Sequence, residues 1–263
     1  MEILVCVRRV PDTSENEIAL NSAGNDIERD ELVYSINEPD NYAVEEALQI
    51  AARDGGTVTV ATVGAEDDEE VLRRQMAMGA THGVLLSDEA FGGSDGRAIA
   101  TILKGLVLKG NYDLILTGVQ AEDGGAQVGG MLAAMLDYPF ASLVNAVEVL
   151  PGKKLKISRE IEGGNKEMSE IDLPCVLSIQ TGINEPRYVG MRGIRQVASI
   201  PIPTYGASEL GIDATSVGEA GAKVKRMDYF LPVLGKGAEM LEGSREEIID
   251  KLVELVAAKG GLK

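Results

Sequence analysis

The feature that most constrains the fold is an alternation, over the first 140 residues, of short apolar runs with segments of helical periodicity. The apolar runs are followed within a few residues by Gly, Pro or Asp, and they cover residues 3–7, 58–63, 84–86 and 114–117. Apolar side chains with the spacing of one helix face follow over residues 43–51, 71–76, 99–106 and 131–136. Parallel strands need a crossover connection, which is usually a helix. This order predicts an α/β fold, with an open, mostly parallel sheet and helices on both faces.

The pattern changes after Pro139, where helical segments become scarce. Strand-like stretches cover residues 143–149, 155–161 and 176–179, with Pro151-Gly152 and Gly163-Gly164 as turns. Hairpin turns connect neighbouring strands without crossovers. We therefore expect an antiparallel extension of the sheet that includes all three stretches.

The last part of the chain, from residue 199 to residue 263, resembles an arm. It is loop-like from Ile200, and Ser244 with Glu247 then forms a capping-box pattern that opens a final helix. This helix has one apolar stripe, made by Ile248, Ile249, Leu252, Val253 and Val256. An arm with so little core of its own packs either on another subunit or back on its own sheet.

The chain is strongly acidic. Its 263 residues include 42 Asp and Glu against 25 Lys and Arg, which gives a formal net charge of −17. This charge repels phosphate backbones, so nucleic-acid binding is not expected. The two cysteines, far apart in sequence, indicate neither a disulfide framework nor a thiolate metal site. We see no export signal and no apolar stretch of the roughly 18 residues that a bilayer span needs, and we expect a cytoplasmic protein without membrane insertion.

Residues for common catalytic chemistries are scarce. His82 is the single histidine and lies in a predicted turn, so neither a Ser-His-Asp triad nor a usual zinc set can be built. The P-loop motif is missing, and no Gly-x-Gly-x-x-Gly follows the first apolar run. We expect no catalytic residue and no metal site.

A glycine-rich loop, residues 118–129, joins the fourth apolar run to a helical segment. Glycines let backbone N–H groups approach a phosphate, and the following helix points its positive end at the anion. In open α/β sheets, ligands lie at the carboxyl ends of strands, where this loop and Asn37-Glu38-Pro39-Asp40 are both expected. The loop therefore either binds a phosphate or serves only as a turn.

A cationic segment opposes the acidic character of the chain. Arg187, Arg192 and Arg195 lie in it beside Met191, and no Asp or Glu occurs from Arg187 through Ser208. Methionine adapts its shape to a partner, and arginine binds carboxylates with two parallel bonds. This composition is typical of a docking element, and a surface loop without a partner is the alternative.

Several motifs resemble the beta (small) subunit of electron-transfer flavoproteins. The most specific are Arg159-Glu160-Ile161-Glu162-Gly163-Gly164, Leu173-Pro174-Cys175-Val176 and Asn184-Glu185-Pro186-Arg187-Tyr188, with support from Ala43-Val44-Glu45-Glu46-Ala47 and Gly118-Val119-Gln120-Ala121. The resemblance covers essentially the whole chain. It is closest to the subgroup that serves trimethylamine-dehydrogenase-type partners.

The resemblance implies a heterodimer whose alpha (large) subunit holds the electron-carrying FAD. This chain would bind AMP in a structural role, support that FAD and dock dehydrogenases to pass electrons toward the respiratory chain. The implied cofactor-binding residues are Cys6, Asn37, Glu38, Pro39, Asp40, Val63, Gly118, Gln120, Ala121, Asp123, Gly124, Gly125, Ala126, Gln127 and Val128. They fall in an implied Rossmann-like, adenine-nucleotide-binding domain over residues 1–198, while the arm over residues 199–263 would pack on the large subunit.

The resemblance also places a recognition loop at residues 184–196, which would contact the dehydrogenase. The implied docking residues are Arg187, Tyr188, Met191, Arg192, Ile194 and Arg195, with Met191 as the apolar anchor.

Two other functions stay open. In flavin-bifurcating members of the family, the same pocket holds a second FAD that oxidises NADH, and their loop has a similar ending to Ala126-Gln127-Val128-Gly129. Gly124 and Gly125 would leave room for that larger dinucleotide. The other alternative, a stand-alone nucleotide-binding stress-type module on a similar fold, predicts a monomer instead of a heterodimer.

Overall fold

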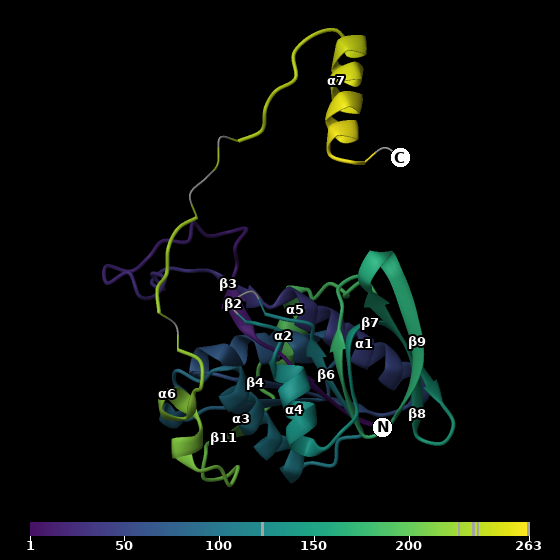
Figure 1. Ribbon diagram of the computed structural model, residues 1–263. Helices are drawn as coiled ribbons and strands as arrows, with labels where there is room; N and C mark the ends of the chain where they lie inside the picture. Colours follow the sequence, from purple (N-terminus) through teal and green to yellow (C-terminus); the bar gives the residue numbers. More distant parts are fainter. Residues whose placement is uncertain (122–123, 226, 233–234, 236, 262–263) are drawn as a thin grey trace. The chain divides into compact units, whose positions relative to one another are not determined.

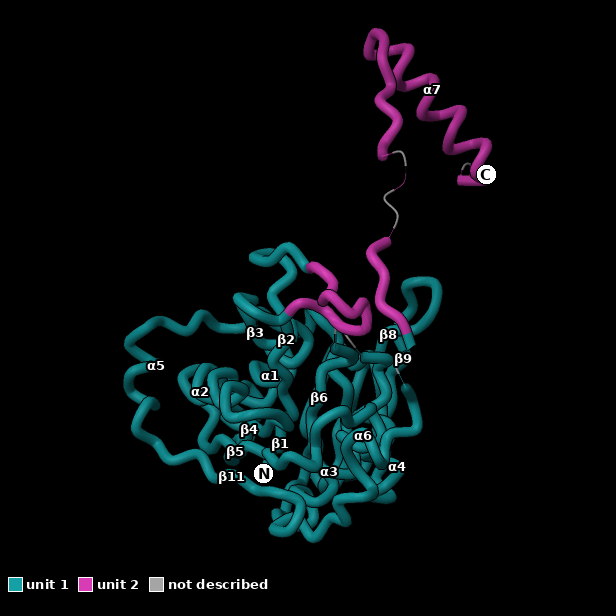
Figure 2. Tube along the Cα trace, turned by 90° about the vertical axis from the view of Figure 1, so that its left-hand side faces the viewer, with its two compact units in different colours: residues 1–18, 29–227 teal, residues 19–28, 228–263 magenta. Residues whose placement is uncertain are grey.

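The computed structural model describes residues 1–121, 124–225, 227–232, 235 and 237–261. The chain forms two compact units, coloured separately in Figure 2. Unit 1 comprises Met1–Ile18 and Arg29–Met227, and unit 2 comprises Ala19–Glu28 and Asp228–Lys263. The division into a nucleotide-binding part over residues 1–198 and an arm over residues 199–263 is a functional one, and it stays a prediction.

Unit 1 is built on one large sheet. Within the described residues it has nine strands in the order β11-β5-β4-β1-β6-β10-β7-β8-β9 (Figure 1). From β11 to β7 all neighbouring strands are parallel, whereas β8 and β9 add antiparallel pairs. The strands are β1 Glu2–Cys6, β4 Thr57–Val63, β5 His82–Leu86, β6 Leu114–Gly118, β7 Phe140–Leu150, β8 Lys154–Ile161, β9 Asn165–Asp172, β10 Cys175–Ile179 and β11 Thr204–Tyr205. The predicted α/β fold, with a mostly parallel sheet and an antiparallel extension, is confirmed.

The placement of residues 176–179 in the antiparallel extension is wrong. They belong to β10, which lies between β6 and β7 and runs parallel to both. The extension contains β9 instead, an eight-residue strand whose mostly exposed, charged sequence gave no strand signal. All five residues of β10 are buried, as is typical of a parallel strand that is covered on both faces.

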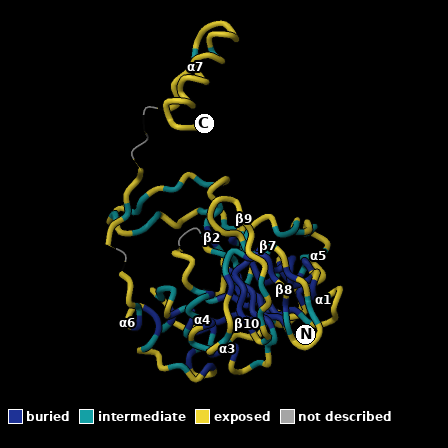
Figure 3. The backbone as a smooth tube through the Cα atoms, turned by 45° about the vertical axis from the view of Figure 1, so that its right-hand side comes forward, coloured by how far each residue is buried: buried dark blue, intermediate teal, exposed yellow. Residues whose placement is uncertain are grey.

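Helices cover both faces of the sheet. On one face, α1 Glu38–Asp54 and α2 Glu69–Met78 pack on side chains such as Ile3 and Val5. On the other, α3 Gly96–Lys109 and α4 Val128–Leu136 pack on the intervening side chains, such as Leu4. Successive side chains of a strand point to opposite faces, so β1 contributes to both cores. The buried residues in Figure 3 are concentrated in these strands and in the inner faces of the helices.

Shorter elements complete unit 1. β2 Arg9–Pro11 pairs antiparallel with β3 Tyr34–Ile36. The segment expected as a loop near residue 190 contains a short helix, α5 Met191–Val197, and α6 Gly218–Gly221 follows β11. Single 3₁₀ turns occur at Glu66–Asp68, Glu89–Phe91, Glu162–Gly164 and Ala214–Ser216.

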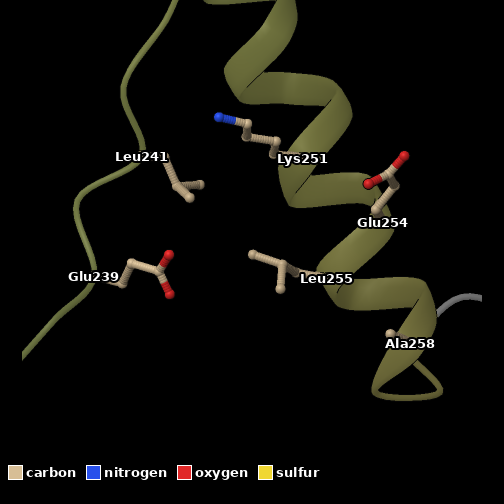
Figure 4. A pocket seen from close by; sticks show the side chains of 6 residues that line it. All are labelled: Glu239, Leu241, Lys251, Glu254, Leu255 and Ala258. Carbon is tan, nitrogen blue, oxygen red and sulfur yellow. The ribbon is translucent and has the colours of Figure 1, made fainter.

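Unit 2 contains the C-terminal helix α7 Arg245–Ala258. The predicted capping box is confirmed, because the Ser244 hydroxyl accepts from the Glu247 backbone N–H while the Glu247 carboxylate accepts from that of Ser244. No residue of α7 is buried among the described residues. Leu241 and Leu255 point toward each other across a pocket between this helix and the preceding segment (Figure 4).

Candidate functional site

The strand order reverses in the middle of the sheet, between β1 and β6. From β1 the chain continues through α1 to β4 on one side, and from β6 it continues through α4 to strands on the other side. Connections that leave two adjacent strands in opposite directions open a crevice at their carboxyl ends, where open α/β sheets bind ligands. The residues at this switch point therefore form the candidate site.

Asp40, in the first turn of α1, joins the two central strands. Its carboxylate accepts a hydrogen bond from the backbone N–H of Arg8, after β1, at 2.9 Å, and another from that of Gly118, at the end of β6, at 3.0 Å. Gly118 has no room for a side chain, because an added Cβ would lie 2.8 Å from the Asp40 backbone nitrogen and 2.8 Å from the Pro39 Cβ. The start of α1 is thus packed directly against both strand ends.

Burial controls the protonation of two predicted site residues. It raises the pKa of Asp40 to about 7, although hydrogen bonds from Asn37, Arg8 and Gly118 oppose the shift. At the end of β1, burial and the charge of Asp40 raise the pKa of the Cys6 thiol to about 12. Cys6 is therefore a protonated thiol at neutral pH, whereas Asp40 titrates near neutrality.

Asn37 precedes α1 and presents an unused acceptor. Its side-chain nitrogen donates to the backbone oxygen of Gln120 at 2.9 Å, which connects α1 to the glycine-rich loop. Its side-chain oxygen is buried and has no hydrogen-bond partner among the described residues. Buried polar atoms are nearly always paired in native proteins. This oxygen is therefore suited to accept a hydrogen bond from a bound ligand.

The glycine-rich loop leads from β6 into α4. Gly124, Gly125, Ala126 and Gln127 are exposed, and Ala126 has a left-handed backbone with φ of 56°. The helix begins at Val128, and no side chain caps its first N–H groups in the described part of the loop.

The other predicted cofactor-binding positions lie around the same edge. The backbone oxygen of Ala121 accepts a bond from the Gly124 N–H at 3.0 Å. Val63 ends β4, the neighbour of β1, and Glu38 is exposed at the first position of α1. Asp123 lies outside the described residues.

The predicted docking residues gather on the segment that contains α5. Tyr188 is 92 % exposed and Met191 is 66 % exposed. Arg192 and Arg195 are exposed as well, and Ile194 is half-buried. This segment offers an aromatic ring, a thioether and two guanidinium groups to solvent.

Arg187 differs from the other predicted docking residues because its guanidinium group is bound within unit 1. Its Nε and Nη2 atoms donate to the two carboxylate oxygens of Glu45, in α1, at 2.7 and 2.9 Å. Burial of Glu45 is outweighed by hydrogen bonds from Arg187 and Gln49, so the pKa of this carboxyl group is lowered. Arg187 is thus paired with a charge of its own chain.

Three residues that shape the site were missed in the sequence. Arg8 supplies a backbone bond to Asp40, while Glu45 and Glu46 bind the segment before α5. A signal was present for the last two, because adjacent glutamates stand in an otherwise apolar helical stretch, residues 43–51. No comparable signal distinguishes Arg8, which contributes through its backbone.

The described residues hold no group of three or more His, Cys, Asp and Glu side chains arranged to bind a metal ion. No helix in the same residues is long and apolar enough to cross a membrane.

Unit 1 is a doubly wound α/β protein with a candidate ligand site at its topological switch point. A family model described as "Electron transfer flavoprotein domain" matches residues 25–210. The electron transfer flavoprotein subunit beta of Methylophilus methylotrophus is 36% identical over 97% of this chain and 98% of its own length. That of Thermoanaerobacterium thermosaccharolyticum is 35% identical over 97% of each chain. The caffeyl-CoA reductase-Etf complex subunit CarD of Acetobacterium woodii is also 35% identical, over 98% of this chain and 99% of its own. The chain therefore belongs to the electron transfer flavoprotein family, and the resemblance inferred from its motifs is confirmed.

Proposed function

We propose that this chain is the small subunit of a heterodimeric electron-transfer flavoprotein, and that it binds AMP at the switch point of its sheet. In the heterodimer it supports an FAD held mainly by the large subunit and docks a dehydrogenase, and it makes and breaks no covalent bond itself. Family membership supports the electron-transfer role. The single observation that supports the nucleotide is the buried, unpaired side-chain oxygen of Asn37, which directly precedes α1 at the switch point.

The residues around the crevice fit AMP. The Asn37 oxygen would accept a hydrogen bond from the nucleotide, and the backbone N–H groups of residues 125–128 would bind its phosphate. Residues 118–129 contain no Lys or Arg, so backbone dipoles replace side-chain cations in this proposal. Asp40 already accepts hydrogen bonds from the backbone N–H groups of Arg8 and Gly118, and it would position the loop without touching the phosphate.

The nucleotide assignment is tested by counting what the purified heterodimer releases. Mass spectrometry should find AMP, and flavin absorbance should give one FAD per heterodimer. The Asn37→Ala variant should lose AMP several-fold, whereas Asn111→Ala, which removes an exposed amide elsewhere in unit 1, should retain it. Two flavins per heterodimer without AMP would contradict the proposal.

The second candidate function is that of a flavin-bifurcating subunit, with an FAD in the same crevice that oxidises NADH. The room around Gly124 favours it, because among the described residues the atoms nearest to a Cβ added there, in Ala121, would lie 3.7 Å away. This candidate predicts two flavins per heterodimer and bleaching of the flavin absorbance on addition of NADH. The AMP proposal predicts one flavin and no rapid reduction by NADH.

Met191 is the proposed apolar anchor of the docking surface, and its truncation tests that role. The Met191→Ala variant should weaken binding of the cognate dehydrogenase by roughly 1–3 kcal/mol, because anchors at interface centres contribute most of the binding energy. Stopped-flow electron transfer at varied dehydrogenase concentration measures this effect. Met168→Ala, which truncates another exposed methionine on β9, is the matched control. Unchanged transfer in Met191→Ala would remove this residue as the anchor.

A further inference from the structure

Residues 184–200, here called the docking segment, are bound at their beginning by two buried glutamates of α1. Arg187 forms its two-bond ion pair with Glu45, which is 4 % exposed, and its backbone N–H donates to the same carboxylate at 3.2 Å. The side-chain nitrogen of Asn184 donates to the Glu46 carboxylate and to the Tyr42 backbone oxygen, at 3.1 Å each. We call these contacts the first clamp.

A second clamp binds the other end of the docking segment to α2. The Nη1 atom of Arg73 donates to the backbone oxygens of Val197 and Ile200, at 2.7 Å each. The same guanidinium group is oriented by Glu69, one turn earlier in α2, at 2.6 Å from Nη2 and 2.8 Å from Nε. The two carbonyl groups lie at and beyond the end of α5, where helices leave backbone acceptors unpaired.

Between the clamps, the segment has an inner and an outer side. Val189 and Val197 pack against the core beneath α1 and α2, and a Cβ added at Gly193 would lie 3.4 Å from the Ala77 backbone oxygen of α2. The outer side presents Tyr188, Met191, Arg192 and Arg195. The inner contacts thus determine which side chains face solvent.

We infer that Glu45, Glu46 and Arg73 are positioning residues for docking, because the two clamps hold the docking segment in the shape that its partner binds. This inference rests on the proposed docking function. A seven-residue helix is unstable alone in water, and α5 has no side-chain N-cap, so external contacts must keep it folded. A segment that is ordered before binding does not lose that conformational entropy on association.

The inference also divides the arginines of the segment by role. Arg187 is neutralised by Glu45, so the cations left to face a partner are Arg192 and Arg195, on either side of Ile194. The partner surface that fits them carries carboxylates around an apolar pocket for Met191.

Hydrogen–deuterium exchange of the intact heterodimer tests the clamps directly. In Glu45→Gln and in Arg73→Gln, amides of residues 190–197 should exchange roughly ten-fold faster or more, as expected when a charged hydrogen-bonded contact is lost. Two controls remove the same charges from exposed neighbours: Glu185→Gln in the same segment and Arg74→Gln in the same helix. Exchange in the clamp variants that matches the controls would overturn the inference.

Electron-transfer kinetics then separate the inference from the docking proposal. The clamp variants should raise the apparent KM for the dehydrogenase several-fold and leave kcat, AMP content and the flavin spectrum unchanged. Arg73→Lys, which keeps the charge but loses the fork of donors, should be intermediate. One outcome would overturn the inference and leave the docking surface standing: Met191→Ala slows electron transfer, while the clamp variants show faster amide exchange but an unchanged KM. If Met191→Ala also leaves transfer unchanged, the docking proposal itself fails.

Discussion

Asp40 is a buried carboxyl group that accepts backbone hydrogen bonds from Arg8, which follows β1, and from Gly118, which ends β6. Burial raises its pKa from 3.8 to about 7, so the folded chain holds a proton that the unfolded chain releases between about pH 4 and pH 7. A group of this kind makes the folded state less stable as the pH rises through that window, and its effect is constant outside it. Most paired carboxylates act in the opposite direction.

This reasoning predicts how Asp40→Asn changes the pH dependence of stability. The free energy of unfolding of wild type should contain a term that falls between about pH 4 and pH 7, by at most about 4 kcal/mol, since each of the roughly three pKa units is worth about 1.4 kcal/mol. Asn cannot titrate, so the variant should lack this term. Denaturant unfolding at several pH values measures the difference in slope between the two proteins. Equal slopes across this range would contradict the prediction.

Among the helices and strands, those that bury an apolar face could be predicted from the local pattern of apolar residues alone. The runs at residues 3–7, 58–63, 84–86 and 114–117 correspond to β1, β4, β5 and β6. β9 was missed because six of its eight side chains are charged or polar, and it lies on an edge of the sheet, where charge prevents pairing with other chains. The direction of β10 depends on a partner strand, β6, about sixty residues earlier, and local pattern contains no information on that pairing.

The candidate site, like the sheet, could be predicted only in part from the sequence. The glycine-rich loop and Asn37–Asp40 could be placed at one edge of the sheet, because carboxyl ends of parallel strands share an edge. The hydrogen bonds that the backbone N–H groups of Arg8 and Gly118 donate to Asp40 could not be predicted, since they depend on how α1 packs across two strands. The clamps were missed for a similar reason: Arg73 and Val197 are far apart in sequence and meet only where α5 lies on α2.

Close packing of α4 on the sheet predicts opposite outcomes for two adjacent glycines. A Cβ added at Gly129 would lie 2.5 Å from the Ser178 Oγ and 2.8 Å from the Thr117 Oγ1, so Gly129→Ala should destabilise unit 1 by about 1–3 kcal/mol. At Gly130 the nearest atom would be 3.4 Å away, on the Phe140 ring, so Gly130→Ala should be neutral or stabilise by up to about 1 kcal/mol. Thermal unfolding of the two variants measures this contrast. Equal effects of the two substitutions would show that α4 does not approach the sheet this closely.

For the whole molecule, the net charge of −17 is unevenly distributed. Residues 187–208 contain no acid, and Arg192 and Arg195 of this stretch are exposed. Charged surfaces increase association rates with partners of opposite charge and suppress contact with like-charged ones. The acidic remainder therefore favours encounters in which a carboxylate-bearing partner meets the docking segment.

The apolar side of α7 leads to the prediction for assembly. Ile249, Leu252, Val253, Leu255 and Val256 are each 43–52 % exposed, and a helix of 14 residues is marginal alone in water. We propose that the arm packs on the large subunit, so the double variant Leu252→Asp with Val256→Asp should lose the large subunit on co-purification. Interface anchors typically contribute about 1–3 kcal/mol each, so the affinity should fall by at least ten-fold.

The thermal unfolding of unit 1 should stay unchanged, because both substitutions lie in unit 2. The polar pair Asp250→Asn with Glu254→Gln, in the same helix, is the control. A heterodimer that survives the apolar pair of substitutions as well as the polar pair would show that α7 does not hold the large subunit.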